Sequence, residues 1–465
     1  MRCTGRAAER EWYPSHSMRL NAHLVRSTLV GALGGLLFGF DTAVIAGTTH
    51  QLTEVFHLVP QLHLLIPNLG LTVSIALWGT VIGAIGAGPL GQKIGGREAL
   101  RIMALLYLVS SLGCALAWNW PSLLAFRVIG GLGIGGSSVL GPVYLAELAP
   151  PKLRGRLVGL FQMNIVAGIL LAYASNYVVA RLVQSADTWR WQFGVATVPA
   201  LLFAIFLFGI PRSSRWLVTQ NRIAEARAVL ELMGTPNSEA ELKEIIDSIH
   251  VEQLDKREPL FQRKYRLPIF LAISIGMFNQ LAGINAILYY ANDIFGYAGF
   301  TGLLGDKQAV LLGAMNFCAT ILAMTVIDKL GRKTLLLIGS VGTAACLAGV
   351  GAIFHAQAGQ SYLVWLLVGF IFFFSISQGA VIWVYISEVF PNRVRSKGQS
   401  LGSSSHWIMN AIISGFFPWV AAHSTAVPFM FFSAMMVLQF FVVLIVYPET
   451  KGVSLEQLQH RLGIE

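Results

Sequence analysis

Residues 144–154 have the sequence Tyr-Leu-Ala-Glu-Leu-Ala-Pro-Pro-Lys-Leu-Arg, and residues 385–395 have the sequence Tyr-Ile-Ser-Glu-Val-Phe-Pro-Asn-Arg-Val-Arg. Both follow the pattern YxxExxPxxxR, and each comes directly after a long apolar run. A second pair of related stretches, residues 92–97 and 328–333, forms basic, glycine-containing loops earlier in each half. The chain therefore contains two related halves, and the apolar runs around these motifs decide which fold the halves adopt.

The composition predicts a protein that lies mostly in lipid. Of its 465 residues, 55% are apolar and 12% are charged, whereas a soluble domain carries about 25% charged residues because it must hydrate its whole surface. Runs that cross a hydrocarbon core of about 30 Å need about 20 apolar residues. We predict twelve such runs, at residues 28–50, 70–91, 99–118, 121–146, 157–182, 189–209, 267–291, 309–328, 333–354, 361–390, 398–422 and 426–446. The expected fold is an all-α membrane protein with twelve transmembrane helices.

The net charge of +10 is explained by the placement of Lys and Arg in the loops on one side of the membrane, and it does not indicate a nucleic-acid partner. Lys and Arg concentrate in every second loop, and such loops stay in the cytoplasm. We therefore expect an inner (plasma) membrane protein with both termini in the cytoplasm. Residues 1–25 are polar and basic, and the first apolar run is too long for a signal peptide, so no secretory signal is expected. Nothing in residues 1–17 predicts structure, so the expected start is either Met1 or Met18.

The longest hydrophilic stretch, residues 212–266, lies between the sixth and the seventh apolar run and leaves six runs on either side of it. Two amphipathic patterns within it, at residues 221–233 and 238–254, predict short cytoplasmic helices separated by Gly234-Thr235-Pro236-Asn237. Two repeated six-helix bundles with a pathway between them are the usual design for alternating access, which a channel or a membrane enzyme does not need. The expected parts are a tail at 1–25, a bundle at 26–210, a helical linker at 211–266, a second bundle at 267–447 and a tail at 448–465.

Six short motifs follow one another along the chain. They are Gly39-Phe40-Asp41-Thr42, Arg127-Val128-Ile129-Gly130-Gly131, Ala146-Glu147-Leu148-Ala149-Pro150, Gln280-Leu281-Ala282-Gly283-Ile284-Asn285, Asp328-Lys329-Leu330-Gly331-Arg332-Lys333 and Pro448-Glu449-Thr450-Lys451-Gly452. Together they resemble the motifs of the sugar porters of the major facilitator superfamily, which include bacterial sugar–proton symporters and facilitative glucose transporters. The resemblance covers residues 28–458 and implies the major facilitator fold, with two pseudo-symmetric six-helix bundles.

Three stretches depart from the pattern of that family. In residues 92–97, Gly96 stands where a second arginine is usual, and Gln92 replaces the usual Asn or Asp. Arg212 stands where the family has glutamate, and Asn279 replaces the first residue of a Gln-Gln pair. The first two departures predict a weaker charge network on the cytoplasmic side. The third changes the reach of an amide at the sugar site.

Asp41 lies in the middle of the first run, where a bare carboxylate is costly and marks a functional site by default. Arg127 is the only cation deep in the fourth run and is the expected partner of Asp41. The resemblance implies that a carboxylate here marks proton-coupled members, whereas facilitative members carry an uncharged amide. Symport is therefore favoured, and a fixed structural ion pair between the two runs is the alternative.

Amide side chains at mid-depth predict a site for a sugar, because amides donate and accept hydrogen bonds without carrying a charge. Gln280 and Asn285 are five residues apart, about 140° around an ideal helix, so they converge only if the helix is interrupted. Gly283 permits such a break. The alternative for any single amide is an interhelical hydrogen bond, worth about 0.6 kcal/mol in membranes. The five amides are Gln162, Asn279, Gln280, Asn285 and Asn316.

The resemblance implies that these amides bind the sugar and adds aromatic neighbours to them. Trp383 is expected against the C–H face of the sugar ring, as aromatic side chains pack on apolar surfaces. Trp407 and His406 are expected in the lower part of the cavity, where His406 contacts the sugar or, alternatively, titrates. Phe38 and Tyr289 are candidate aromatic gates, and packing is the alternative role for both of them and for Trp407.

Charged residues at the ends of several spans predict ion pairs on the cytoplasmic side. Pairs that form only while that side is shut would stabilise the outward-open state. Exposed pairs contribute little to stability, so simple topology charge is the alternative. The expected pairs join Glu147 to Arg97 or Arg154 and Glu388 to Arg332 or Arg395, with Asp328 in the same network.

The expected protein is a functional monomer that carries a monosaccharide and a proton across the bilayer. A uniporter with a structural Asp41 is the first alternative. A sugar sensor is the second, and the short C-terminal tail disfavours it. The four cysteines match no metal or redox spacing, and neither a nucleophile–base set nor a phosphate loop indicates an enzyme, so no cofactor is expected. The first-contact amides do not identify the sugar, because the candidate sugars differ by one or two hydroxyls.

Overall fold

The computed structural model describes residues 22–58, 68–148, 154–235, 237–255, 258–300, 302–391, 393–453 and 455–464, and every regular element in these ranges is a helix. The predicted tail up to residue 21, with Met18, lies outside the described residues, as do Pro150 and Pro236. The side chains of Arg154 and Asp328 lie outside them as well.

Six helical segments of membrane length make up the first half of the chain. They are α1 (Ala22–Val44), α3 (Asn68–Ile94), α4 (Gly96–Ala115), α5 (Trp120–Leu148), α6 (Arg154–Leu182) and the consecutive pair α7 (Thr188–Val195) and α8 (Thr197–Phe206). Glycines let these helices approach closely. A Cβ atom on Gly39 of α1 would lie 1.8 Å from the carbonyl oxygen of Ile165 on α6, and one on Gly131 of α5 would lie 2.0 Å from that of Ala76 on α3.

The second half repeats this plan with more interruptions. Its segments are α12 (Arg266–Leu281) with α13 (Ile284–Tyr289), α15 (Leu303–Leu330), α16 (Arg332–Ala356), α17 (Leu363–Phe374) with α18 (Ala380–Glu388), α19 (Arg395–His423) and α20 (Val427–Val446). In the described part of the chain, eleven segments are long and apolar enough to span a membrane. The 29-residue α19 packs against α3 and α12 and gives twelve long segments in all, as predicted.

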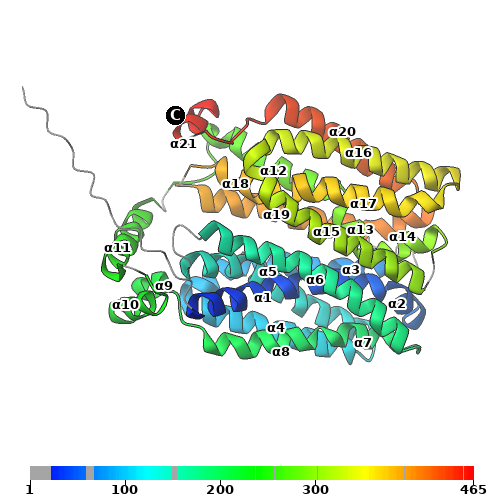
Figure 1. Cartoon of the computed structure of the whole chain (residues 1–465), viewed down its shortest axis with the longest axis horizontal. Coiled ribbons are helices and arrows are strands. Elements are labelled where there is room, and N and C mark those ends of the chain that lie inside the picture. Colours follow the sequence, from blue (N-terminus) through cyan, green and yellow to red (C-terminus); the bar gives the residue numbers. More distant parts are fainter. Residues whose placement is uncertain are drawn as a thin grey trace, which may run out of the picture.

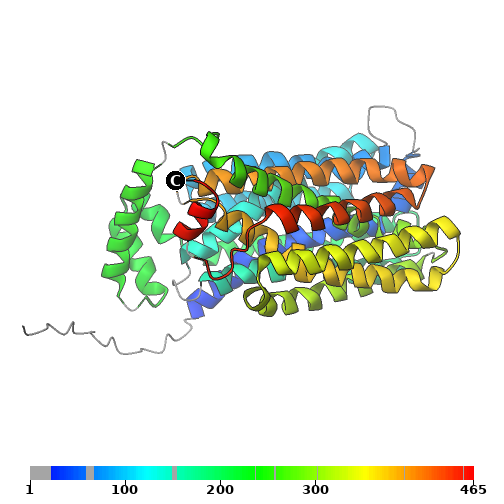
Figure 2. The same cartoon turned by 90° about the horizontal axis from the view of Figure 1, so that it is seen from above.

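The two halves form two layers of roughly parallel helices, with α1 and α3 to α8 in one layer and α12 to α20 in the other (Figure 1). The short helices α9 (Ser214–Thr219), α10 (Ile223–Leu232) and α11 (Ser238–Asp255) lie at one end of the molecule, together with α21 (Leu455–Arg461), as both views show (Figures 1 and 2). We call this the linker end and the opposite end the far end. The two linker helices predicted from amphipathic patterns are confirmed as α10 and α11, whereas α9 was not predicted.

Two interruptions shape the helices of the second half. Gly283 has φ of 81° and separates α12 from α13, which confirms the break predicted there. A left-handed residue cannot continue a right-handed helix, and glycine adopts that conformation without steric cost. The second break is a π-helical turn at Ser375–Gly379, between α17 and α18. Single π turns occur frequently at functional sites.

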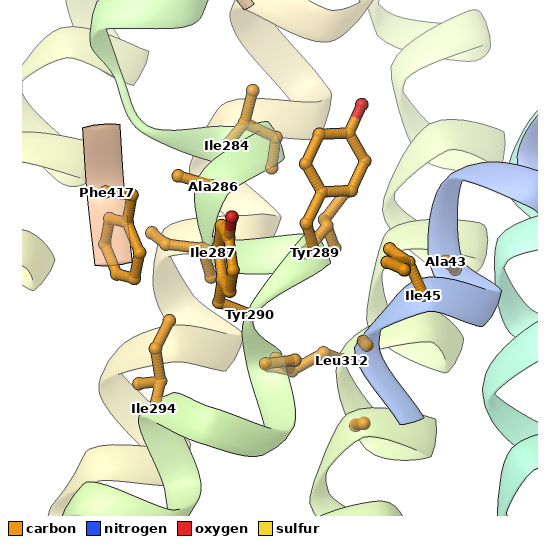
Figure 3. Packing of buried hydrophobic residues seen from close by; sticks show 14 of the residues in the cluster. Ala43, Ile45, Ile284, Ala286, Ile287, Tyr289, Tyr290, Ile294, Leu312 and Phe417 are labelled. Carbon is orange, nitrogen blue, oxygen red and sulfur yellow. The ribbon is translucent and has the colours of Figure 1, made fainter. Parts of the chain in front are cut away.

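The two halves are packed together at the far end. The hydroxyl of Tyr173 on α6 donates to the backbone oxygen of Leu288 on α13 at 2.7 Å. In Figure 3, Tyr289 lies on the side of α13 that faces Ala43 and Ile45, and Tyr290 lies on the side nearer to Phe417. The rings of Tyr290 and Phe417 stack with centroids 5.1 Å apart. Buried aromatic and aliphatic side chains thus close the far end between the halves.

Candidate functional site

The Asp41–Arg127 pair joins α1 to α5 inside the first half. Nη1 of Arg127 lies 3.3 Å from Oδ2 of Asp41, and the two side chains are 4% and 16% exposed, respectively. Nε of Arg127 has no hydrogen-bond partner among the described residues. A bidentate arginine–carboxylate pair is shorter and stronger than this single contact. The carboxylate is therefore paired but not locked by a second hydrogen bond from the guanidinium.

A small cavity of about 10 Å³ lies beside this pair, with room for about one water molecule. Both Asp41 and Arg127 line it. Its other walls come partly from the second half of the chain, including Tyr289 and Trp407, and Phe38 of α1 lies beside Trp407 with ring centroids 5.5 Å apart. The carboxylate thus faces the boundary between the two halves and the aromatic side chains predicted as gates.

An amide cluster lies on the opposite side of that boundary, with Gln280 at its centre. Nε2 of Gln280 donates to Oδ1 of Asn279 at 3.1 Å and lies 3.2 Å from the ring nitrogens of His406. Oε1 of Gln280 accepts from Nδ2 of Asn285 at 3.0 Å. The break at Gly283 turns α13 so that two amides five residues apart in sequence meet. An amide N–H only donates, so the His406 nitrogen that receives it carries no proton.

Aromatic rings connect the amide cluster to the cavity at Asp41. The ring of Trp383 lies 5.2 Å from that of His406, and the ring of His406 lies 5.0 Å from that of Trp407, between centroids. Trp407 in turn contacts Phe38. Trp383 is 38% exposed, although His406 and Trp407 beside it are buried. Part of the ring of Trp383 is therefore not covered by other side chains.

The remaining two amides lie apart from this cluster. Asn316 on α15 is buried, and its Oδ1 accepts from the hydroxyl of Ser375 in the π turn at 2.9 Å. Gln162 on α6 is half-buried, and among the described residues no hydrogen bond joins it to the cluster. The structure therefore brings Asn279, Gln280, Asn285 and His406 together with Trp383 and Trp407. The roles of Gln162 and Asn316 stay predictions.

Charged residues at the linker end form two separate groups. In the second half, Arg332 donates to Glu388 at 3.0 Å. Of the two partners expected for Glu388, Arg332 and Arg395, the structure thus places Arg332 in contact with it. Arg395 instead donates to the backbone oxygen of Phe390 at 3.4 Å. In the first half, Glu147 is half-buried near the end of α5.

The first-half group is centred on Glu98, which was not singled out from the sequence. Its carboxylate accepts from Arg97 at 2.5 Å, from Arg101 at 2.7 Å and from Arg212 at 3.3 Å. Arg212, which departs from the family pattern, therefore joins the same carboxylate as its two neighbours. The group as a whole carries two more positive charges than negative ones.

Four further polar residues near the site were missed at the level of sequence. Asn410 donates to the hydroxyl of Tyr289 at 3.2 Å, and Ser375 donates to Asn316. Gln378 and Gln439 bind each other at 2.8 Å between the π turn and α20. All four are buried polar groups inside apolar runs. That property was the available signal, because polar side chains within membrane spans are costly and usually functional.

The comparison with protein families agrees with this architecture. A family model described as "Sugar (and other) transporter" matches residues 27–462. The chain belongs to the sugar porter family of the major facilitator superfamily. The D-xylose-proton symporter of Escherichia coli (strain K12) is 34% identical to the transporter, over 94% of its chain and 96% of the relative. The arabinose-proton symporter of Bacillus subtilis (strain 168) is also 34% identical, over 96% of both chains.

Solved structures of the xylose transporter XylE from E. coli share the fold of this chain. Its inward open conformation matches with a TM-score of 0.84 and 34% identity, over 94% of the present chain and 99% of XylE. XylE bound to 6-bromo-6-deoxy-D-glucose matches with a TM-score of 0.76 and 33% identity, over 95% and 99% of the two chains. The transporter therefore has the major facilitator fold.

Proposed function

We propose that the transporter carries a monosaccharide together with a proton into the cytoplasm, by alternating access and as a monomer. The observation that carries this proposal is the position of the Asp41–Arg127 pair. It lies on a cavity at the boundary between the halves, and a line of aromatic rings connects that cavity to the amide cluster. The related proteins named for xylose and arabinose are both proton symporters.

The amide cluster is proposed as the sugar site because of its neutral polarity. Asn279, Gln280, Asn285 and His406 supply donors and acceptors without a net charge that a sugar would have to desolvate. The exposed face of Trp383 adds an apolar surface for the C–H groups of the ring. Such a site binds pentoses and hexoses alike and leaves selectivity to the exact position of each amide.

Asp41 is proposed as the proton site that couples the two fluxes. While it is ionised, its charge is compensated by Arg127, which is favourable in the membrane interior. When it takes up a proton, this attraction is lost, and the single contact to the guanidinium weakens. Arg127 is then free to change partners, and α1 can move relative to α5. The sugar and the proton act on the same boundary and can thus bias the same transition.

The linker end is proposed to face the cytoplasm, with residues 26–210 and 267–447 as the two bundles that move against each other. The basic residues concentrated at that end support this orientation. The packed far end supports an inward-facing arrangement of the structure, and so does the TM-score of 0.84 with the inward open conformation of XylE. The linker at 211–266 then connects the bundles on the cytoplasmic side.

A counterflow assay in proteoliposomes with a panel of monosaccharides tests the proposal. We expect exchange of at least one pentose or hexose and alkalinisation of the outer solution when that sugar is added. Sugar exchange without any proton movement would instead make the protein a uniporter with a structural Asp41. Binding of sugar without exchange would make it a sensor. A chain that neither binds nor exchanges any monosaccharide would contradict the proposal as a whole.

A further inference from the structure

A chain of hydrogen bonds continues from the amide cluster to a buried glutamine of α20. Nε2 of Gln378, in the π turn, donates to Oε1 of Gln439 at 2.8 Å, and both side chains are 1% exposed. The backbone oxygen of Gln378 accepts from Nδ2 of Asn279 at 3.4 Å. Asn279 is bound in turn to Gln280, the centre of the cluster. Gln439 is thus linked to Gln280 through two intermediate residues.

We infer that Gln439 is a positioning residue for the sugar, because it holds the π turn in the place from which the carbonyl of Gln378 orients Asn279 and, through it, Gln280. This inference rests on the proposed function of the amide cluster as the sugar site. Gln439 itself does not belong to that cluster. It binds the side chain of Gln378, whereas Asn279 binds the backbone oxygen of the same residue.

The chain of bonds has a fixed direction, which begins at the carbonyl of Gln378. A backbone carbonyl only accepts hydrogen bonds, so the group of Asn279 that faces it must be the NH₂. Oδ1 of Asn279 then faces Gln280, so Gln280 must present its own NH₂ to that oxygen. Oε1 of Gln280 is left to accept from Asn285. The orientation of each amide therefore follows from one carbonyl oxygen in the π turn.

The contact between that carbonyl and Asn279 is sensitive to small movements. At 3.4 Å it is longer than the roughly 2.7–3.2 Å usual for an N–H···O hydrogen bond, so it is the weakest link in the chain of amides. A shift of the π turn by a few tenths of an ångström away from α12 would break it. Asn279 could then turn its amide over and would no longer fix which group Gln280 presents to a sugar hydroxyl.

The side chain of Gln378 has few other anchors that would hold the turn in place. Besides Gln439, its Nε2 contacts only the sulfur of Met436 in α20, at 3.0 Å, among the described residues, and thioether sulfur is a weak acceptor. Its Oε1 has no partner in the described part of the chain. Loss of Gln439 would thus leave a buried amide with little to bind, and the turn that carries it would rearrange.

The test replaces Gln439 by methionine, which keeps the volume and removes the amide. Sugar affinity is measured by quenching of tryptophan fluorescence, and the maximal rate by counterflow. We expect the dissociation constant to rise about three- to tenfold, the effect of losing one neutral hydrogen bond, with little change in the maximal rate. Discrimination between epimeric sugars should also shrink. Without the fixed Asn279, the amide of Gln280 can present either its NH₂ donor or its oxygen acceptor to a sugar hydroxyl, so it selects less strictly for the position of that hydroxyl.

Ser433→Ala is the matched control on the same helix. Ser433 is a buried polar residue of α20 whose hydroxyl donates to the backbone oxygen of Ala344 at 2.8 Å, outside the chain of amides. Its replacement should leave affinity and discrimination unchanged. If Gln439→Met fails to fold, Gln378→Met removes the same link from the other side and is expected to give the same result.

A double mutant separates positioning from a general structural effect. In an Asn279→Ala background the chain is already cut, so adding Gln439→Met should change affinity no further. An equal additional loss in that background, or unchanged affinity and discrimination in Gln439→Met alone, overturns the inference. Absence of sugar binding by the unmodified chain would overturn the proposed function and this inference with it, so the two failures are distinguishable.

Discussion

Asp41 meets Arg127 through a single contact of 3.3 Å, inside the first half of a membrane protein. An uncompensated carboxylate there is expensive, so the guanidinium stabilises the ionised form. The same carboxylate lines a cavity with room for about one water molecule. A paired carboxylate beside such a cavity is the arrangement on which the proposed proton site rests, and the test below separates it from a purely structural ion pair.

At Asp41, replacement by asparagine separates proton coupling from sugar movement. Asn keeps the size of the side chain but cannot carry the proton. We expect Asp41→Asn to retain sugar counterflow and to lose uphill accumulation, so that the internal concentration only reaches the external one. Asp187→Asn is a matched control, because Asp187 pairs with Arg190 at 3.0 Å at an exposed position. Accumulation that survives in Asp41→Asn would show that the pair is structural.

Among the elements, the broken seventh segment shows why backbone conformation decides the site. Asn285 reaches Gln280 only because Gly283 ends α12 and lets α13 start in a new direction. A Cβ atom added at Gly283 would also lie 2.3 Å from the ring of Phe432 on α20. Both the left-handed backbone and the close packing therefore require glycine at this position.

Gly283→Ala is therefore expected to reduce stability by about 1–3 kcal/mol, from backbone strain and overpacking. It should also weaken sugar binding, because the two amides no longer meet. The measurements are thermal unfolding in detergent and sugar affinity by fluorescence. Gly86→Ala is the control, since Gly86 lies in α3 and a Cβ atom there has nothing within 4 Å. Wild-type stability and affinity in Gly283→Ala would contradict this account of the break.

At the far end, α14 (Ala291–Tyr297) provides a second element with a testable response, this time to pH. Burial raises the pKa of Asp293 to about 6, while Thr49, the charge of His50 and the backbone N–H of Asp293 lower it. Nδ1 of His50 also lies 3.6 Å from Oε1 of Glu54, and both residues belong to the short helix Thr49–Val55 of the first half. Thr49 and His50 belong to the first half, so the environment of Asp293 exists only while the far end is closed.

Closure of the far end should therefore take up a proton at Asp293. The stabilisation that this proton gives is complete below the ordinary pKa of 3.8 and is lost as the pH rises through about 6. Between pH 7.5 and 5 we expect the ratio of closed to open far ends to rise about tenfold. Spin-label distances across the far end measure this ratio. Asp293→Asn should flatten the dependence, and an unchanged slope in that variant would assign the response to other groups.

For the molecule as a whole, composition and pattern were enough to predict the twelve segments, the linker helices and the break at Gly283. These features depend on local periodicity, on the cost of charges in lipid and on the conformational freedom of one glycine. The three arginines around Glu98 and the link between Gln378 and Gln439 were not predictable. Each depends on which helices become neighbours and on the rotation of the π turn, which a single sequence does not specify.

Alternating access requires that contacts between the halves differ in strength between the two end states, since only such contacts shift the populations. The hydrogen bond from Tyr173 to the backbone oxygen of Leu288 is one of these contacts, because it joins α6 to α13 at the closed far end. The hydroxyl of Tyr144 makes a bond of the same length, 2.7 Å, to the backbone oxygen of Pro211, the first residue of the linker, so this bond involves no residue of the second half. The two tyrosines thus form a matched pair.

Tyr173→Phe should favour opening of the far end, whereas Tyr144→Phe should not. Loss of one hydrogen bond between the halves is worth about 0.5–1.5 kcal/mol, which corresponds to a shift of about two- to tenfold in the ratio of the two states. Tyr144→Phe costs a similar bond in both states, so it lowers stability without moving the ratio. Spin-label distances across the far end report the ratio, and thermal unfolding reports stability. If both variants moved the populations equally, the contact of Tyr173 would not belong to the gate, and closure would depend on the packing of α13 and α14 against α1.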